Sequence, residues 1–389
     1  MPHTIAAHYI FTNTGAPIKN GVVTFDDNGK VLNISQLDAE TPNTIFYNGI
    51  ITPGFVNAHC HLELSHLKGK VNDANSLVDF VCKMSKLGAT PYQESDAKDA
   101  DDMMYRDGVM AVGDICNTAN TADIKQYSKI HYQNFVELIG TSHSRCVADI
   151  AQYNNVYNRY RECGLMDKDI CAVAHAPYSV GPELFGVIND INKDKRRIIS
   201  IHNQETQAEN TLYINHSGEI VERFPIDLNE IPVTGNTSLQ SVGQYLNYEN
   251  VLLVHNIYTS ADDMDYAKRT FKNPFFVICP KSNLFLEHNI GDVPLMMKKD
   301  LTVCLGTDSL SSNDRLSMVE EMYALQNYYP EISLEDIIKF ATINGAKSLG
   351  MDSDLGTIEK GKRAGLVLIE GIDFENLRLK QGCVARRLV

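Results

Sequence analysis

The sequence has no long apolar run, no cysteine pair motif and no excess of basic residues. None of its apolar stretches approaches the roughly 20 residues that a membrane span requires. Its 35 Lys and Arg residues face 49 Asp and Glu residues, which gives a formal net charge of −14. A chain this acidic has no electrostatic reason to bind nucleic-acid phosphates or anionic membranes. We therefore expect no nucleic acid and no membrane among its partners.

The nine cysteines are odd in number and scattered, and no C-x-x-C pair occurs. This usage indicates reduced thiols rather than a disulfide framework. The first residues, MPHTIAAHYIFTNTGAP, lack the basic segment and apolar core of a signal peptide. From these two absences we expect a cytoplasmic protein.

Short apolar runs alternate with helix-like stretches through most of the 389 residues. The runs are GFVNAH, VMAVGD, NFVELIG, ICAVAHA, IISIH, VLLVHN, FFVICP and TVCLGTD. Eight such strands with helices between them predict a (β/α)₈ barrel, an α/β fold. Most runs end in a polar residue: His59, Asp114, His175, His202, His255 and Asp308. Because chemistry in these barrels sits at the carboxyl ends of the strands, we predict that these side chains meet at one mouth.

Both ends of the chain are rich in strand-like segments. GVVTF and KVLNI are joined by DDNG, which is the chemistry of a hairpin turn. GLVLIEG and CVARRLV follow a late helix, SLEDIIKFATINGAKSLG, in which Ser333 and Asp336 have capping-box spacing. We predict a small β-sandwich-like domain made of residues 1–50 and 351–389, and a catalytic barrel of residues 51–350.

His59 and His61 form an H-x-H pair at the end of the first barrel strand. Alternate residues of a strand share one face, so both imidazoles can hold one metal ion. An isolated H-x-H is equally compatible with a hydrogen-bonded surface pair, but His202, His255 and Asp308 end other strands. Imidazoles with a carboxylate suit Zn²⁺, Fe²⁺ or Ni²⁺ rather than Ca²⁺ or Mg²⁺. Such an ion makes hydroxide available from water near neutral pH, which is the requirement of a hydrolase.

Glu205 follows His202 by three residues and is the candidate proton donor to a heterocyclic nitrogen. The alternative is a carboxylate that only stabilises the start of a helix through the helix dipole. The adjacent candidate metal site favours the catalytic role.

These residues lie within a set of segments that resembles the amidohydrolase superfamily. The segments are ITPGFVNAHCHLELS, HAPYSV, HNQE, LVHN, CPKSN, LGTDSLSSN, ATINGA and GTIEKGKRAGLVLI. The resemblance is strongest to the branch with aminofutalosine, adenosine-type and guanine deaminases and triazine hydrolases. It implies one divalent metal held by His59, His61, His202 and Asp308, because the fourth strand has no lysine to bridge a second ion. Zn²⁺ is favoured over Fe²⁺ and Ni²⁺.

The resemblance also implies roles in the reaction. Glu205 would shuttle protons, and His255 and Asp308 would orient and deprotonate water, so all three are candidate catalytic residues. His175, Glu205 and His255 are candidate substrate contacts. Arg145 is either a contact for an anionic tail or a solvated loop charge. The family's usual HxAE reads HNQE here, from which we expect a more polar pocket wall.

The implied activity is release of ammonia from a purine-like or other nitrogen heterocycle by water, in a homodimeric enzyme. Two alternatives remain open. The same site could hydrolyse a C–Cl, C–S or cyclic amide bond, or the chain could be a non-catalytic scaffold. The presence of every expected ligand argues against a scaffold.

Overall fold

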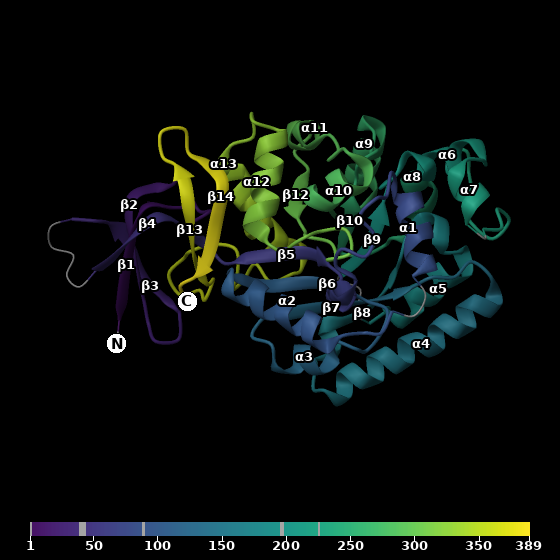
Figure 1. Ribbon diagram of the computed structural model, residues 1–389, viewed down its shortest axis with the longest axis horizontal. Helices are drawn as coiled ribbons and strands as arrows, with labels where there is room; N and C mark the ends of the chain where they lie inside the picture. Colours follow the sequence, from purple (N-terminus) through teal and green to yellow (C-terminus); the bar gives the residue numbers. More distant parts are fainter. Residues whose placement is uncertain (1, 39–43, 88–89, 195–197, 225) are drawn as a thin grey trace.

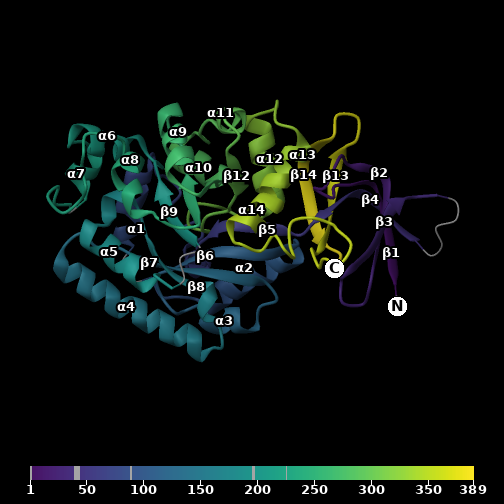
Figure 2. The same ribbon diagram turned by 180° about the vertical axis from the view of Figure 1, so that it is seen from behind.

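A computed structural model of the protein describes residues 2–38, 44–87, 90–194, 198–224 and 226–389. Residues 39–43 of the predicted small domain therefore lie outside the described residues. Figure 1 and Figure 2 show a strand-and-helix barrel beside a smaller β-sheet, and both termini lie at the smaller sheet.

The eight apolar runs form the strands of the barrel in the described chain. These are β5 (Phe55–Cys60), β6 (Val109–Cys116), β7 (His131–Leu138), β8 (Ile170–Ala174), β9 (Ile198–Asn203), β10 (Asn250–His255), β11 (Asn273–Ile278) and β12 (Thr302–Leu305). They pair in parallel as two four-stranded sheets, β5 to β8 and β9 to β12. Every residue of β5, β8, β9 and β10 is buried, as expected for parallel strands covered on both faces.

Backbone hydrogen bonds close the two sheets into one barrel at their carboxyl ends. The His202 amide donates to the His175 carbonyl at 2.9 Å, which joins β9 to the end of β8. The amides of Thr307 and Asp308 donate to the His59 carbonyl at 3.0 and 3.1 Å, which joins the end of β12 to β5. Gly306 permits this second closure, because a Cβ there would lie 2.9 Å from the His59 carbonyl oxygen. The predicted (β/α)₈ barrel is confirmed.

Helices cover the outside of the barrel and its connections (Figure 1). They are α1 (Leu77–Lys86), α2 (Glu94–Arg106), α3 (Ala122–Tyr127), α4 (His143–Glu162), α5 (Pro182–Ile191), α6 (Gln207–Asn215), α7 (Glu219–Arg223), α8 (Ser238–Val242), α9 (Ala261–Thr270), α10 (Pro280–Glu287), α11 (Val293–Lys298), α12 (Met318–Tyr328), α13 (Leu334–Ala341) and α14 (Ile343–Ser348). Short 3₁₀ turns are η1 (Leu62–Leu67), η2 (Asp167–Asp169), η3 (Pro177–Ser179) and η4 (Gly243–Tyr245). Within the described ranges, no helix is both long and apolar enough to span a membrane.

The predicted late helix is two helices, α13 and α14, which meet at Thr342. Ser333 caps α13 by accepting the Asp336 amide at 3.1 Å, as its spacing indicated. Thr342 leaves the helical conformation, with φ −133° and ψ −91°. Its hydroxyl accepts the Asn13 side-chain amide at 2.7 Å, so the break connects the barrel to the N-terminal segment.

Both ends of the chain contribute to one six-stranded sheet. Its strands are β1 (His3–Ile10), β2 (Ile18–Phe25), β3 (Val31–Gln36), β4 (Thr44–Pro53), β13 (Leu366–Asp373) and β14 (Arg378–Arg387), in the order β14-β13-β4-β1-β2-β3. The predicted hairpin joins β2 to β3, and Gly29 in its turn has a φ of +74°. A small β domain made from both termini is confirmed, whereas the exact boundaries at residues 50 and 351 stay a prediction.

Candidate metal centre

Three imidazoles meet at the carboxyl end of the barrel strands. His59 and His61 lie at the end of β5 and His202 lies in β9, and all three are buried. The Nε2 atoms of His59 and His61 are 3.2 Å apart, and those of His61 and His202 are 3.4 Å apart. The two-residue period of the strand therefore turns both β5 imidazoles toward the histidine of a strand far away in the chain.

The protonation pattern of this group fits a bound cation. His202 donates from Nδ1 to the His175 carbonyl at 2.7 Å, so in the neutral ring its Nε2 offers a lone pair toward His61. Burial and, to a smaller extent, the neighbouring His59 lower the pKa of His61 to about 3. Ligands about 2.1 Å from one tetrahedral ion are about 3.4 Å apart, which is close to both observed separations. The residues present therefore fit a divalent metal ion.

Asp308 supplies a carboxylate to the same place from the end of β12. Its Oδ1 lies 3.5 Å from His61 Nε2 and 3.7 Å from His59 Nε2. Its Oδ2 accepts the hydroxyls of Ser282 at 2.7 Å and Ser312 at 2.6 Å. Burial alone would raise the pKa of Asp308, but the hydrogen bond with His59 and the charges of His61 and His255 hold it well below its usual range. One oxygen is thus fixed by serines while the other faces the imidazoles.

His255 and Glu205 complete the cluster. His255 Nδ1 donates to the Asn283 side-chain oxygen at 2.8 Å, and its Nε2 lies 3.5 Å from Glu205 Oε1. Burial raises the pKa of Glu205 well above 4.5, and the nearby Asp308 raises it further. His255 and Asp308 have φ values of 75° and 57°, an unfavourable backbone region for such residues. Backbone strain of this kind is often found at functional sites, where it aims side chains that a regular strand would not.

Asp114 is not part of this group, so the prediction that all six polar strand ends meet is wrong for it. β6 continues for two residues beyond Asp114, and its carboxylate pairs with the fully buried Lys125 of α3 at 2.5 Å. Its other oxygen accepts the Leu62 amide at 2.8 Å, directly after His61. Asp114 therefore supports the backbone behind the cluster rather than facing it.

Asn203 and Gln204 do not make the pocket wall more polar, contrary to expectation. Gln204 donates to Asn210 and Asp263 at 3.1 and 2.9 Å, behind the strand. Asn203 donates to Asn256 at 3.0 Å. Strand alternation turns Asn203 away from the face of His202. Gln204 lies beyond the end of β9, where its φ of 47° departs from the strand conformation.

The remaining candidates lie at different distances from the cluster. Arg145 is exposed on α4, where it donates to the Ile139 carbonyl at 3.3 Å and faces Asp149 at 3.8 Å. This placement fits a solvated charge, although it lies on a helix and not in a loop. His175 lies beside the cluster, with its ring centroid 5.0 Å from that of His202. It remains partly exposed, and its Nδ1 pairs with the Ser179 hydroxyl at 2.7 Å.

Sequence reasoning missed Glu137, Ser282, Ser312 and Asn283. The carboxylate of Glu137 in β7 lies with ring nitrogens of His175 and His202 within a 4.8 Å group. Burial raises the pKa of Glu137 to about 7, against the effect of a hydrogen bond from Asn117. The segments CPKSN and LGTDSLSSN carried the signal for the other three residues, but no role followed from spacing alone.

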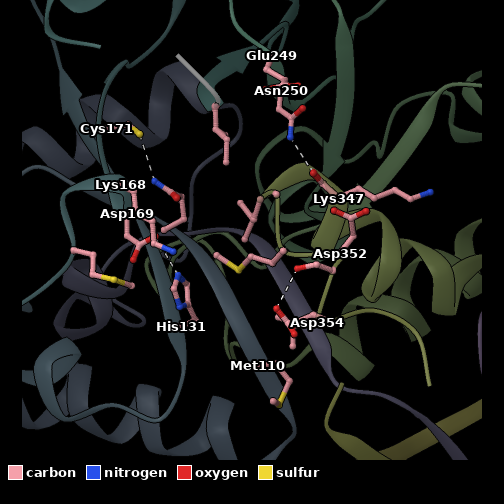
Figure 3. A pocket seen from close by; sticks show the side chains of 18 of the residues that line it. Met110, His131, Lys168, Asp169, Cys171, Glu249, Asn250, Lys347, Asp352 and Asp354 are labelled. Carbon is pink, nitrogen blue, oxygen red and sulfur yellow. Dashed lines mark hydrogen bonds and ion pairs between the residues drawn. The ribbon is translucent and has the colours of Figure 1, made fainter. Parts of the chain in front are cut away.

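A cavity with a volume of about 1190 Å³ lies at the opposite end of the barrel. Figure 3 shows its labelled lining, which includes His131, Lys168, Asn250, Lys347 and Asp352. His131 and Asn250 are the first residues of β7 and β10, so this is the amino end of the strands. The buried imidazoles are not part of it.

Comparison with known proteins agrees with this geometry. Residues 50–382 match the Amidohydrolase family. An adenosine deaminase of Helicobacter pylori is 28% identical over 331 residues, which are 82% of this chain and 79% of that protein. The crystal structure of H. pylori aminofutalosine deaminase in complex with methylthio-coformycin has a TM-score of 0.78 at 25% identity, covering 94% of this chain and 92% of the other.

A more distant structure shares the fold. An adenosine deaminase from Xanthomonas campestris with bound zinc has a TM-score of 0.72 at 19% identity, covering 97% of this chain and 87% of that one. At this identity the likeness supports the barrel and its attached β domain.

Proposed function

The chain belongs to the amidohydrolase family, and we propose that it is a metal-dependent aminohydrolase that releases ammonia from a purine-like or other nitrogen heterocycle. The observation that carries the proposal is the convergence of the His59, His61 and His202 imidazoles with Asp308 and Glu205. The deaminase names of two similar proteins support the choice of a C–N bond as the one that is hydrolysed.

His59, His61, His202 and Asp308 would hold one divalent ion, for which we propose Zn²⁺ before Fe²⁺ or Ni²⁺. When bound, such an ion makes hydroxide available from water near neutral pH. The fourth strand, β8, has no lysine that could bridge a second ion. The proposed stoichiometry is therefore one metal per chain.

Glu205 is proposed to move the protons of the reaction. Water adds its oxygen to the carbon that carries the amino group, the C–N bond breaks, and ammonia leaves. The reaction needs one proton delivered to a ring nitrogen and one to the departing nitrogen. Burial raises the pKa of Glu205, which favours the protonated form that a donor to a ring nitrogen requires.

His255 and Asp308 are proposed to orient the water and accept its proton. Both are fixed from behind, His255 by Asn283 and Asp308 by Ser282 and Ser312. Fixed partners keep the reacting atoms aligned, which is a major part of catalysis by proximity. We propose His175 as a substrate contact because it is partly exposed beside the cluster.

Two predictions from the sequence remain outside the site itself. The homodimeric state and the cytoplasmic location stay predictions.

The alternative chemistry, hydrolysis of a C–Cl, C–S or cyclic amide bond, uses the same side chains. Assays for ammonia, chloride and ring opening over one panel of substrates separate it from deamination.

The decisive experiment is Glu205→Gln in the metal-loaded enzyme, assayed on adenine, guanine, cytosine and pterin derivatives. We expect unchanged metal content and a loss of kcat of about 10²–10⁴-fold or more, because Gln keeps the shape but carries no transferable proton. The matched control is Glu209→Gln in the first turn of α6. Glu209 is also buried, but it bonds the Gln204 amide and the Ser238 hydroxyl.

The control should keep kcat close to that of the unchanged protein. Near-normal kcat in Glu205→Gln with full metal would refute the assigned role and transfer it to His255. Absence of ammonia release on the whole panel by the unchanged enzyme would refute deamination of these heterocycles.

A further inference from the structure

Glu137 is a buried carboxylate that uses only half of its hydrogen-bonding capacity. It lies in β7, and its side chain is 4% exposed. Its Oε2 accepts the Asn117 side-chain amide at 2.8 Å. Its Oε1 is buried and has no hydrogen-bond partner among the described residues. A buried acceptor without a donor costs free energy, and a donor from a ligand would recover it.

The free oxygen faces the histidine side of the metal centre. Glu137 Oε1 lies 3.5 Å from His202 Nδ1, but that nitrogen donates to the His175 carbonyl at 2.7 Å. Glu137 therefore does not serve as the partner that orients His202. A ring nitrogen of His175, which is partly exposed, lies within the same 4.8 Å group. The imidazole ring of His202 therefore lies between the Glu137 carboxylate and the proposed metal.

Glu63, a neighbouring buried carboxylate, provides a comparison because all of its hydrogen bonds support the protein backbone and side chains. Glu63 is equally buried, and its oxygens accept the Asn117 amide at 2.8 Å, the Thr118 amide at 2.9 Å and the Thr118 hydroxyl at 2.6 Å. Asn117 therefore binds both acids, Glu63 through its backbone and Glu137 through its side chain. Glu63 is fully bonded within the protein, whereas Glu137 leaves one oxygen for something else.

Building on the proposed function, we propose that Glu137 is a substrate-binding residue that accepts a hydrogen bond from a donor on the substrate, away from the carbon that reacts. Glu137 Oε1 is an acceptor without a donor, so the complementary group is a hydroxyl or an N–H. A hydroxyl on a sugar and an N–H of the heterocycle are the two sources of this chemistry. Glu137 then selects substrates that carry such a donor over analogues that lack it.

The experiment compares two ligand pairs, each differing by donor groups. Adenosine against 2′,3′-dideoxyadenosine tests the hydroxyl source, and adenine against 9-methyladenine tests the N–H source. Dissociation constants are measured by calorimetry on metal-loaded protein in a Glu205→Gln background, so that turnover does not interfere. A hydrogen bond to a charged group predicts about tenfold to hundredfold weaker binding of the analogue in one pair.

Glu137→Ala should reduce that ratio to within about twofold while metal content stays unchanged. Glu137→Gln is the second variant. Asn117 needs an oxygen to donate to, so the amide nitrogen of Gln would occupy the free position and present a donor. This variant should also lose the preference. Glu63→Gln, the matched buried control, should keep the ratio even if both constants change together.

Three results would overturn the inference. They are a preference that survives both Glu137 variants, no preference in either pair before mutation, and a parallel loss of metal from both variants. The last would assign Glu137 to a metal-binding group with His175 and His202. Failure of the proposed function is separate, because it is read from ammonia release and not from these binding ratios.

Discussion

The two ends of the barrel differ in what they bury. At the carboxyl end, imidazoles and carboxylates are buried against each other, as in the pair His255 and Glu205. At the amino end lies a cavity of about 1190 Å³, where Lys168, Asp352 and Asp354 are exposed (Figure 3). Solvated charges cost little, whereas buried titratable groups cost free energy unless they are paired or bind a ligand.

This difference teaches that cavity size alone does not locate chemistry. The amino-end cavity is lined by the first residues of strands, such as Asn250, whose side-chain amide donates to the Lys347 carbonyl at 2.9 Å. The carboxyl end instead has side chains whose free atoms face one point, with His255 and Asp308 at positive φ. Backbone strain at titratable residues, together with free side-chain atoms that face one point, marks the carboxyl end as the candidate functional end.

The largest effect that would test the comparison is expected for His202→Ala. Removing this imidazole removes a proposed metal ligand, so metal and activity should disappear together, with kcat lower by more than about 10⁴-fold. Elemental analysis and ammonia release on the same preparation provide the measurement. Activity that persists at full metal content would remove His202 from the ligand set.

The barrel could be predicted from the sequence because strands that are buried on both faces are continuous apolar runs. Each of the eight apolar runs coincides with a strand from β5 to β12 in the described chain. The break between α13 and α14 could not be predicted, because it depends on a contact between Thr342 and Asn13, 329 residues apart. The local pattern of apolar residues predicts local secondary structure, but it does not show a contact between residues so far apart in the sequence.

The local sequence pattern also predicts some residues of the candidate site and not others. The positions of His59 and His61 follow from the two-residue period of one strand. Asp114 was misplaced because a polar residue inside an apolar run does not reveal where the strand ends. Glu137 was missed for the related reason that it lies one residue before the last residue of β7. Inward alternation is the signal that could have found it.

A smaller effect is expected from the residues that hold Asp308 from behind. Ser282→Ala removes one of the two hydroxyls on Oδ2, so the carboxylate should be less well oriented. Loss of such supporting hydrogen bonds typically reduces metal affinity about 10–100-fold. Competition with a chelator measures this affinity. Ser311→Ala is the control, because its hydroxyl pairs with Ser309 rather than Asp308. Equal affinity in both variants would contradict the supporting role.

The smallest effect is expected at the amino end of the barrel. Lys168→Ala and Asp352→Asn each remove an exposed charge that lines the large cavity. Substitutions of exposed residues usually change the free energy of unfolding by no more than about 0.5 kcal/mol. Because water already solvates these groups, kcat/KM should stay within about twofold of the unchanged enzyme. Thermal unfolding and steady-state kinetics are the measurements, and Ser282→Ala provides the reference from the other end. A tenfold loss of kcat/KM in either variant, at unchanged metal content, would show that the cavity communicates with the metal centre. The contrast between a chemical end and a solvated end would then no longer hold.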